Sequence, residues 1–383
     1  MAIDPVLGPN ADLVGVRGSR ERLETPALVL DLDALEHNIA DLARHAARNG
    51  YKLRPAAKVH KSVEIARRQV AAGAIGQCCA TLAEAEILVE AGVPGVFLFS
   101  SVATPGKIAR LVRLASKAKD FLLAVDDLAN VEAIGEAARA AGTKMRLLVD
   151  VEVGGRRTGL ADAGAAVALA QRIARHDSLI YAGIQGYNGG FQSTPSFAER
   201  SALQALCAEV VSGVVDRLRL AGLPPEIVTG GGTGSHAIDA MQGVFTEVQA
   251  GSYVFLDMNY IDADMRADEA RPFRPSLFVR TTVISAAQPS FVVTDAGLKE
   301  FAREGRAAPR PFRGAPEGAR YAIIGDDMGR IEFADPNDRL PVGHAVECLP
   351  PHCYATLNLY PVFHCVRGDT LVDIWPIDAR ATQ

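Results

Sequence analysis

The sequence lacks long runs of charge of one sign and long apolar runs, and each absence excludes a class of protein. The chain of 383 residues carries 40 Lys and Arg against 45 Asp and Glu, and its basic residues form no extended run. Proteins that bind phosphate backbones show a basic patch or stripe, so we expect no nucleic-acid partner. No apolar stretch reaches the ~18 residues that a membrane-spanning helix needs, so we expect no membrane partner.

Cysteine is also scarce, and the composition is not biased toward a fibrous or disordered chain. The six cysteines form no repeated Cys-x-x-Cys pattern and no secretory signal opens the sequence, so we expect reduced thiols in a cytoplasmic protein. Hydrophobic residues make up 49% and charged residues 22% of the chain. These fractions are typical of globular proteins, so we expect one or two folded domains.

Between about residues 25 and 260 the sequence repeats a short apolar run, a polar turn and an alanine-rich amphipathic stretch. The apolar runs predict strands at Ala27–Leu32, Leu53–Lys58, Gln77–Thr81, Val96–Ser100, Leu122–Asp126, Met145–Asp150, Ile180–Tyr187, Glu226–Thr229 and Ser252–Asp257. The stretches between them favour helices, at Ala34–Asn49, Leu82–Ala91, Leu128–Ala141 and Ala161–Ile173. Alternating strands and helices predict a parallel sheet, and the number of units matches a (β/α)₈ barrel better than an open doubly wound sheet.

Beyond about residue 270 the pattern changes to short runs separated by Pro, Gly and Asp clusters. Runs at Ser276–Thr282, Ser290–Thr294, Tyr321–Ile324 and Thr370–Trp375 predict an antiparallel β domain. Prolines and arginines among small residues predict a surface loop at Arg306–Gly318. The expected architecture is an α/β protein, with a (β/α)₈ TIM-type barrel over residues 25–265 and a β-strand domain from residues 1–24 and 266–383.

The segment Leu53–Lys61 places two lysines and a histidine, Lys58, His60 and Lys61, at the end of a predicted strand. Active sites of (β/α)₈ barrels lie at the carboxyl ends of the strands. An amine among other cations and apolar barrel residues loses proton affinity, as a lysine that reacts with a carbonyl group requires. The alternative is a basic surface loop that holds a phosphate or a helix end.

The segment Thr229–Ser235 is rich in glycine, threonine and serine and follows another predicted strand. Glycines allow backbone N–H groups to converge on an anion and the hydroxyls add donors, so the segment predicts a phosphate site. It lacks the Gly-Lys-Ser/Thr of a P-loop. A flexible turn and a dinucleotide fingerprint at Gly232, Gly234 and Ala237 with Asp257 are the other interpretations, and the late place of the segment in the chain argues against the fingerprint.

Two further segments lie at predicted strand ends. Gln249–Tyr253 belongs to the strand after the glycine-rich segment, and the loops after strands seven and eight of such barrels commonly bind phosphate together. Asp150–Gly159 carries Arg156 and Arg157, of which one can serve a phenolate or carboxylate, or both can lie in a solvated loop. A phosphate cradle, a strand-end lysine and such an arginine in one barrel suggest pyridoxal phosphate as the cofactor.

The chain resembles the family of D-threonine aldolase and D-serine dehydratase, whose fold-type III barrel is shared with bacterial alanine racemase. The motifs that carry the resemblance run nearly end to end, at Glu24–Asp33, Thr229–Ser235, Gln249–Tyr253, Asp295–Lys299 and Trp375–Pro376. The resemblance implies a homodimer in which each β domain closes the barrel of the other subunit. The active site, for a small amino-acid substrate, is then expected near the subunit interface.

The resemblance also implies roles for particular residues. Lys58 corresponds to the lysine that binds the cofactor, and Arg157 to the arginine that holds its phenolic oxygen. Gln185 and Tyr187 correspond to residues that line the pyridine ring, or else they form a polar pair of the barrel core. The phosphate is expected on Thr233, Gly234, Ser252 and Tyr253.

Three positions depart from the family pattern. The aldolases carry Arg-Pro-His before the cofactor lysine, and this chain has Ala56 in place of the histidine. The aldolases hold a divalent metal on His-x-Asp and the dehydratases hold zinc on His-x-Cys, whereas here His352 is followed by Tyr354 at the second position. Met328 replaces the histidine of an Asp-Glu-His-Gly motif. A metal site needs several donors, so His352 alone does not predict one, and Cys353 points away from it if both lie on one strand.

The resemblance implies a lyase that cleaves a β-hydroxy-D-amino acid to glycine and an aldehyde. Such an aldol cleavage needs a base at the β-hydroxyl, and His60 and His352 are the candidates, each of which can also be a structural histidine. An acid at the hydroxyl favours β-elimination, as in a dehydratase for D-serine or 3-hydroxyaspartate. Racemisation needs proton carriers on both faces of Cα, with Lys58 on one and Tyr354 or Tyr360 on the other. A cofactor carrier is a further alternative, against which the β domain argues.

Overall fold

The computed structural model describes residues 8–303, 307–335 and 337–380. The chain forms two compact units. The barrel unit comprises Ala40–Gly251 and Ala263–Pro272. The sheet unit comprises the described residues up to Ile39, the segment Ser252–Asp262 and the described residues from Phe273 onward.

The barrel unit is built on a parallel sheet. Its strands are β2 (Lys52–Leu53), β3 (Gln77–Cys79), β4 (Val96–Leu98), β5 (Leu122–Val125), β6 (Met145–Asp150), β7 (Leu179–Gly186), β8 (Ile227–Gly230) and β9 (Glu247–Val248). Neighbours in the order β2-β9-β8-β7-β6-β5-β4-β3 are paired in parallel. A parallel bridge between Ala56 and Cys78 joins the two ends of this order, so the strands close into a ring. The predicted (β/α)₈ barrel is thereby confirmed.

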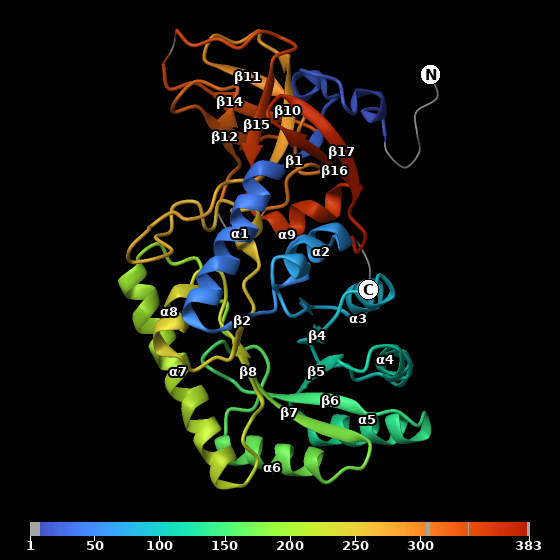
Figure 1. Ribbon diagram of the computed structural model, residues 1–383. Helices are drawn as coiled ribbons and strands as arrows, with labels where there is room; N and C mark the ends of the chain where they lie inside the picture. The colour runs from blue at the N-terminus through green and yellow to red at the C-terminus, as the bar shows by residue number, and fades with distance from the viewer. Residues whose placement is uncertain (1–7, 304–306, 336, 381–383) are drawn as a thin grey trace. The chain divides into compact units, whose positions relative to one another are not determined.

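Helices connect the successive parallel strands. They are α2 (Val63–Ala71), α3 (Leu82–Glu90), α4 (Pro105–Lys117), α5 (Leu128–Ala140), α6 (Ala163–Ala174), α7 (Phe197–Leu220) and α8 (His236–Gln242), and α1 (Leu32–Asn49) precedes β2. Polar side chains begin several of them; Thr81 and Glu84, for example, form a reciprocal capping box at the start of α3. Figure 1 shows α3, α4 and α5 along the outer side of the barrel strands.

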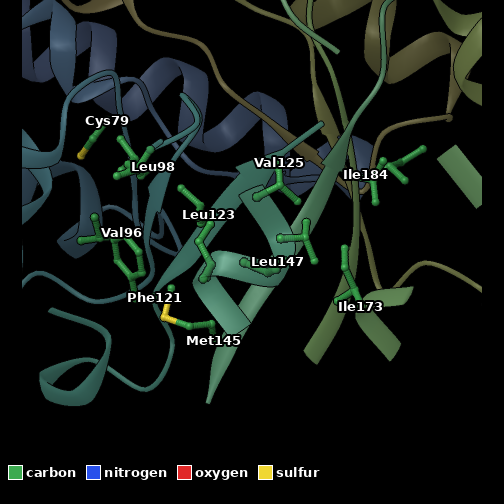
Figure 2. Packing of buried hydrophobic residues seen from close by; sticks show 14 of the residues in the cluster. Cys79, Val96, Leu98, Phe121, Leu123, Val125, Met145, Leu147, Ile173 and Ile184 are labelled. Carbon is green, nitrogen blue, oxygen red and sulfur yellow. The ribbon is translucent and has the colours of Figure 1, made fainter. Parts of the chain in front are cut away.

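The main core of the barrel unit lies between its strands and helices. Alternate residues of β5 and β6, such as Leu123, Val125 and Leu147, are buried in one apolar cluster with Ile173 of α6 (Figure 2). Because successive side chains of a strand point to opposite faces, the residues between them, such as Leu148, face the inside of the ring. Both faces of the strands are therefore apolar, as the uninterrupted apolar runs of the sequence predict.

The sheet unit is built on a mainly antiparallel sheet. Its strands are β1 (Ala27–Asp31), β10 (Leu277–Ser285), β11 (Phe291–Thr294), β12 (Arg310–Arg313), β13 (Arg320–Ile323), β14 (Gly329–Glu332), β15 (Ala345–Leu349), β16 (Val362–Arg367) and β17 (Thr370–Pro376). The main order is β13-β14-β11-β10-β1-β16-β17, and β15 pairs with β10 and β12. The pair of β1 and β16 is parallel. A short helix, α9 (Cys353–Thr356), lies between β15 and β16 in the chain. The predicted antiparallel β domain is confirmed.

Buried ion pairs fix the N-terminal segment on this sheet. Arg20 donates to both carboxylate oxygens of Glu347 on β15, at 2.9 and 2.7 Å. Arg280 of β10 lies 3.3 Å from the same carboxylate, and all three side chains are buried. Both arginines bind this one carboxylate, so loss of Glu347 would leave two buried guanidinium groups without their shared partner.

Four predicted elements differ in the structure. The predicted strand Leu53–Lys58 is a strand only at Leu53 and ends in the 3₁₀ helix η3 (Ala57–Val59). The run Ala27–Leu32 forms β1 in the sheet unit instead of a barrel strand, because an apolar run fits either sheet and only its partners decide. Ser252–Asp257 is not a strand and begins with the 3₁₀ helix η4 (Ser252–Val254). Within the predicted loop Arg306–Gly318, β12 pairs with β15 at an edge where Pro311 is tolerated. In the described ranges, no helix combines the length and apolar character that crossing a bilayer takes.

Candidate active site

Lys58 lies at the carboxyl end of the first barrel strand. After β2 the chain forms the 3₁₀ helix η3 (Ala57–Val59), which contains Lys58. The N–H of Ala56 donates to Ala250 O at 3.1 Å, and a Cβ on Gly251 would lie only 2.4 Å from Val59 Cγ2. The turn that holds the lysine therefore packs directly on the segment after β9.

The surroundings of Lys58 favour its neutral form. Burial lowers the pKa of the Lys58 ammonium below its ordinary value, and the positive charge of Arg157 lowers the pKa further. The Lys58 Nζ lies 5.4 Å from the centroid of the Phe99 ring, just after β4. An amine of lowered pKa at the strand ends is the arrangement expected of a lysine that reacts with a carbonyl group.

Arg157 lies in the loop after β6, where the sequence predicts it. Its guanidinium carbon is 5.9 Å from the centroid of the Phe99 ring and 5.3 Å from that of the Tyr187 ring. Lys58 and Arg157 therefore lie at one aromatic side chain, Phe99, that the sequence analysis did not single out. The available signal is an aromatic residue near the end of the predicted strand Val96–Ser100, under the same strand-end rule that points to Lys58.

Gln185 lies in a buried polar network under this site. Its Nε2 donates to Asp150 Oδ1 at 2.9 Å, and its Oε1 accepts from Gln249 Nε2 at 3.2 Å. Thr158 donates to the other oxygen of Asp150 at 2.7 Å. Burial raises the pKa of the Asp150 carboxyl, and the hydrogen bonds from Thr158 and Gln185 oppose that shift. The network ties the ends of β6, β7 and the segment after β9 to one another.

The two predicted phosphate loops follow the seventh and eighth barrel strands, β8 and β9, and they are bonded to each other. Gly251 N–H donates to Thr233 Oγ1 at 3.2 Å, and Gln249 N–H donates to Gly230 O at 2.9 Å. The spatial pairing of the loops, which rested on strand counting alone, is thus present in the structure. The Thr233 residue is only 3% exposed, so the surrounding loops fix its position.

Gln192 holds the glycine-rich loop, although no sequence motif marks it as a site residue. Its Oε1 accepts from the N–H groups of Gly234 and Ser235 at 3.0 and 3.1 Å. Its Nε2 donates to Ser235 Oγ at 3.0 Å. The amide of Gly234, predicted to bind phosphate, therefore donates to a protein side chain in this structure. Both N–H groups converge on one side-chain oxygen, Gln192 Oε1.

The carboxyl group of Asp239 also binds the glycine-rich loop. Ser235 Oγ donates to Asp239 Oδ2 at 2.8 Å, and Gln204 Nε2 donates to the other oxygen. Asp239 is fully buried among these neutral donors, and burial raises the pKa of its carboxyl to about 7. The loop is thus built on an acid that changes its charge near neutral pH.

His60 lies in the barrel core beside η3. It is fully buried, and its Nδ1 accepts from Ser62 N–H at 3.1 Å. Burial lowers the pKa of the His60 imidazole to about 4, against hydrogen bonds with Gln69 and Gln77. A neutral imidazole without exposed surface has the features of a structural histidine, the alternative that the sequence left open.

The remaining predicted residues belong to the sheet unit. Ser252 and Tyr253 are buried in η4, with the Tyr253 ring 5.6 Å from the Phe273 ring between centroids. The Ser252 and Tyr354 hydroxyls share a hydrogen bond of 2.5 Å. His352 precedes α9, and the ring centroids of His352 and Tyr354 are 4.4 Å apart. The segment is thus a helix start, not the strand on which the predicted direction of Cys353 depended.

His352 is held by two side chains of the same unit. Its Nδ1 lies 3.2 Å from Asn259 Nδ2 and 3.5 Å from Asp257 Oδ2. Asp257 is fully buried and also accepts from Cys353 N–H at 2.8 Å. The Asn259 amide and the Asp257 carboxylate hold the imidazole in one orientation, and an imidazole can accept or deliver a proton.

The barrel end fits a phosphorylated carbonyl compound with an acidic oxygen. Lys58 offers an amine of lowered pKa, Arg157 offers a permanent cation, and the bonded loops after β8 and β9 bring the Thr233 hydroxyl to the same strand ends. Glycine is required where these loops approach other backbone: a Cβ on Gly234 would lie 1.8 Å from Gln192 O. This donor set suits a phosphate and a carbonyl group together.

Comparison with known proteins identifies the family. The chain belongs to the family of the alanine racemase N-terminal domain, whose profile matches residues 30–259, and a profile described as a serine dehydratase domain matches residues 276–366. The chain is 38% identical to D-threonine aldolase of Arthrobacter sp. over 360 residues, which cover 94% of this chain and 93% of that protein. It is 34% identical to 3-hydroxy-D-aspartate aldolase of Paracoccus denitrificans (strain Pd 1222) over 374 residues, with coverage of 96% and 95%.

A solved structure agrees with these relatives. The crystal structure of D-threonine aldolase from Filomicrobium marinum matches with a TM-score of 0.90 and 36% sequence identity, over 94% of this chain and 96% of that one. Both the fold and the family that the motifs predict are therefore confirmed. The relatives named here are aldolases, which are lyases.

Proposed function

We propose that the chain is a pyridoxal-phosphate-dependent lyase that cleaves a β-hydroxy-D-amino acid to glycine and an aldehyde. One observation carries the proposal: Lys58, Arg157 and two bonded loops after the seventh and eighth strands lie at one end of the barrel. The names of the relatives, D-threonine aldolase and 3-hydroxy-D-aspartate aldolase, support the reaction and the configuration of the substrate.

The residues of the barrel end bind the cofactor in this proposal. When bound, pyridoxal phosphate supplies an aldehyde that joins to amines and a ring that withdraws electrons from the bonds at Cα of an amino acid. Lys58 is the amine that holds it, because the lowered pKa of Lys58 favours the neutral form. Arg157 places a permanent positive charge at the phenolic oxygen. Thr233 and Ser252 contribute hydroxyls to the phosphate.

Cleavage between Cα and Cβ requires removal of the β-hydroxyl proton, and His352 is our candidate for that base. Asn259 and Asp257 hold its Nδ1 side, so the ring keeps one orientation and its protonated form has a carboxylate beside it. We do not propose His60 for this step, because it is fully buried and its pKa is lowered to about 4.

A D-amino-acid dehydratase is the second candidate, favoured by the match of residues 276–366 to the serine dehydratase domain. β-Elimination expels the hydroxyl group, so it needs a proton donor where aldol cleavage needs an acceptor. A protonated His352 can supply that proton. The two reactions therefore use the same side chain in opposite protonation states.

Two measurements test the proposal. Borohydride reduction of the cofactor-loaded protein, followed by peptide mapping, should find the cofactor attached to Lys58 and to no residue in Lys58→Ala. Turnover of D-threonine, D-serine, D-3-hydroxyaspartate and D-alanine is then assayed for glycine, keto acid and enantiomer separately. Glycine plus aldehyde supports the aldolase, and keto acid plus ammonia supports the dehydratase. Enantiomer alone, or a protein that takes up no cofactor, refutes the proposal.

The assembly and location of the protein remain predictions. We propose a homodimer on the resemblance to alanine racemase, and light scattering of the loaded enzyme tests it. A cytoplasmic location is favoured by the six cysteines, which are all buried thiols.

A further inference from the structure

We infer that the position of a family metal ligand has become a hydrogen-bonding position in this chain. Tyr354 positions Ser252, and the enzyme works without a divalent metal at His352. The inference rests on the proposed function in one respect, since it takes Ser252 as a residue that binds the cofactor's phosphate. The claim that no divalent metal binds at His352 rests only on the possible ligands in the sheet unit.

The donors of the sheet unit do not fit a divalent metal. His352 offers one nitrogen. The family carries a carboxylate or thiolate two residues after this histidine, and here that position is the phenol of Tyr354. A phenol has an ordinary pKa of about 10 and must lose its proton before it binds a metal. Met328, in place of a motif histidine, is exposed in the turn between β13 and β14, and a thioether does not suit a hard divalent cation. Across the ranges that the structure describes, no three His, Cys, Asp or Glu side chains gather as a possible metal site.

The Tyr354 hydroxyl has a different partner. It shares a hydrogen bond of 2.5 Å with the Ser252 hydroxyl, and Ser252 is 1% exposed at the start of η4. Ser252 follows Gly251, whose N–H bonds Thr233 Oγ1 in the other phosphate loop. A buried serine hydroxyl can rotate to several acceptors, and a phenol at hydrogen-bond distance selects one orientation. Tyr354 therefore fixes the direction in which Ser252 can donate.

His352 keeps a defined orientation without a metal. Asn259 and Asp257 hold its Nδ1, and the Tyr354 ring packs against its ring at an angle of 49° between planes. Tyr354 in place of the family carboxylate or thiolate thus removes a metal ligand. It adds a ring that packs against His352 and a hydroxyl that bonds Ser252. The carboxylate of Asp257 is itself occupied by Cys353 N–H and Asn259 N–H, at 2.8 and 3.1 Å.

The first experiment measures manganese binding directly. Wild-type holoenzyme is dialysed against EDTA and titrated with Mn²⁺ by electron paramagnetic resonance, with Tyr354→Asp and Tyr354→Cys alongside. We expect no stoichiometric site in the wild type below millimolar Mn²⁺, and at least about tenfold tighter binding when a carboxylate or thiolate restores the second ligand. A stoichiometric wild-type site that is lost in His352→Ala would overturn the inference, whether or not the new variants fold.

The second experiment measures the positioning role. Tyr354→Phe and Ser252→Ala should each weaken cofactor affinity by about two- to tenfold, and the double variant should lose little more than either alone. The ³¹P resonance of the bound cofactor should move in Tyr354→Phe. Tyr321→Phe is the matched control, because its hydroxyl is also bonded within the sheet unit, to Ala296 O at 2.6 Å, and should leave the resonance unchanged. Additive losses, or an unmoved resonance in Tyr354→Phe, would contradict the role.

The two proposals fail in different ways. A wild-type protein that takes up no cofactor refutes the proposed function and leaves the manganese titration as an independent test of whether a divalent metal binds at His352. A loaded enzyme that cleaves its substrate, loses activity in EDTA and regains it with Mn²⁺ refutes the present inference and leaves the proposed function intact. Unchanged turnover in EDTA supports both.

Discussion

The barrel end and the segment at residues 352–354 hold their functional groups by different means. In the barrel end the backbone itself is fixed: the loops bond each other through Gly251 N–H, and a Cβ on Gly234 would collide with backbone. In the segment at 352–354 single side chains hold single side chains, as Asn259 holds His352. A change of chemistry in the barrel end needs several compensating changes, whereas in the segment it needs one. Of the three departures from the family pattern, Tyr354 lies in this segment, Ala56 lies in the barrel end and Met328 lies between β13 and β14.

Substitution of Asp239 has the largest expected effect on the free energy of unfolding, because this fully buried carboxyl group supports the loop after β8 in the barrel end. Burial raises its pKa from 3.8 to about 7, so the folded protein binds this proton more tightly than the unfolded chain. The contribution of Asp239 to the free energy of unfolding is therefore greatest at low pH, falls by about 4 kcal/mol between pH 4 and 7, and is constant above.

Asp239→Asn should remove that fall, since it cannot ionise and a turned Gln204 amide can still bond it. The measurement is the difference in unfolding free energy between variant and wild type as a function of pH, in denaturant. Asp216→Asn, an exposed position on α7, is the control and should show no trend. A difference for Asp239→Asn that stays constant from pH 4 to 8 would show that the buried acid keeps its ordinary pKa.

Gly234→Ala tests the backbone contact that distinguishes the barrel end. Its Cβ would lie 1.8 Å from Gln192 O, and backbone cannot move aside as a side chain can. We expect a loss of about 1–3 kcal/mol in the free energy of unfolding. Gly213→Ala on α7 meets nothing within 4 Å and should gain up to about 1 kcal/mol. The free energies of unfolding are measured in denaturant. Equal changes for the two substitutions would show that the backbone contact of Gly234 does not fix the loop in the barrel end.

Substitutions of Arg157 have the smallest expected effect, which is on cofactor affinity. They distinguish the role of its charge from the role of its planar shape. Arg157→Gln should weaken cofactor affinity by about tenfold or more, because it removes a charged hydrogen bond. It should also raise the pKa of Lys58, which the charge of Arg157 lowers. Cofactor capture should then need a higher pH. Arg157→Lys keeps the charge, so its pH dependence should match the wild type while its affinity falls; a pH shift common to both variants would count against this account.

The sequence could predict the features that local chemistry determines. The strand ends, the glycine-rich loop and the lysine follow from residue types and from the rule that barrel sites lie at carboxyl ends. Both loops of the predicted phosphate site come together in the structure, as strand counting requires. Lys58 and Arg157 also lie together, at the Phe99 ring.

Features that depend on partners far along the chain could not be predicted. Gln192 is an ordinary loop residue until the fold brings it to Gly234 and Ser235. Asp239 lies in a short helix, and nothing in its neighbours signals complete burial. The run Ala27–Leu32 is apolar enough for either sheet, and only β10 and β16 decide its place. Periodicity reports that a residue is buried, not which partner buries it.

The closure of the barrel also sets the order in which a growing chain can fold. Arg54, beside the closing bridge, forms a buried ion pair with Glu247, at 2.8 and 3.0 Å, so the ring is complete only when the eighth strand has been synthesised. Strand β1 precedes the whole barrel, yet it pairs with β10 and β16, so its partners are made last. A nascent chain that has just finished its barrel therefore still carries Ala27–Asp31 as an apolar strand without a sheet. That segment is where we expect a chaperone to bind during synthesis.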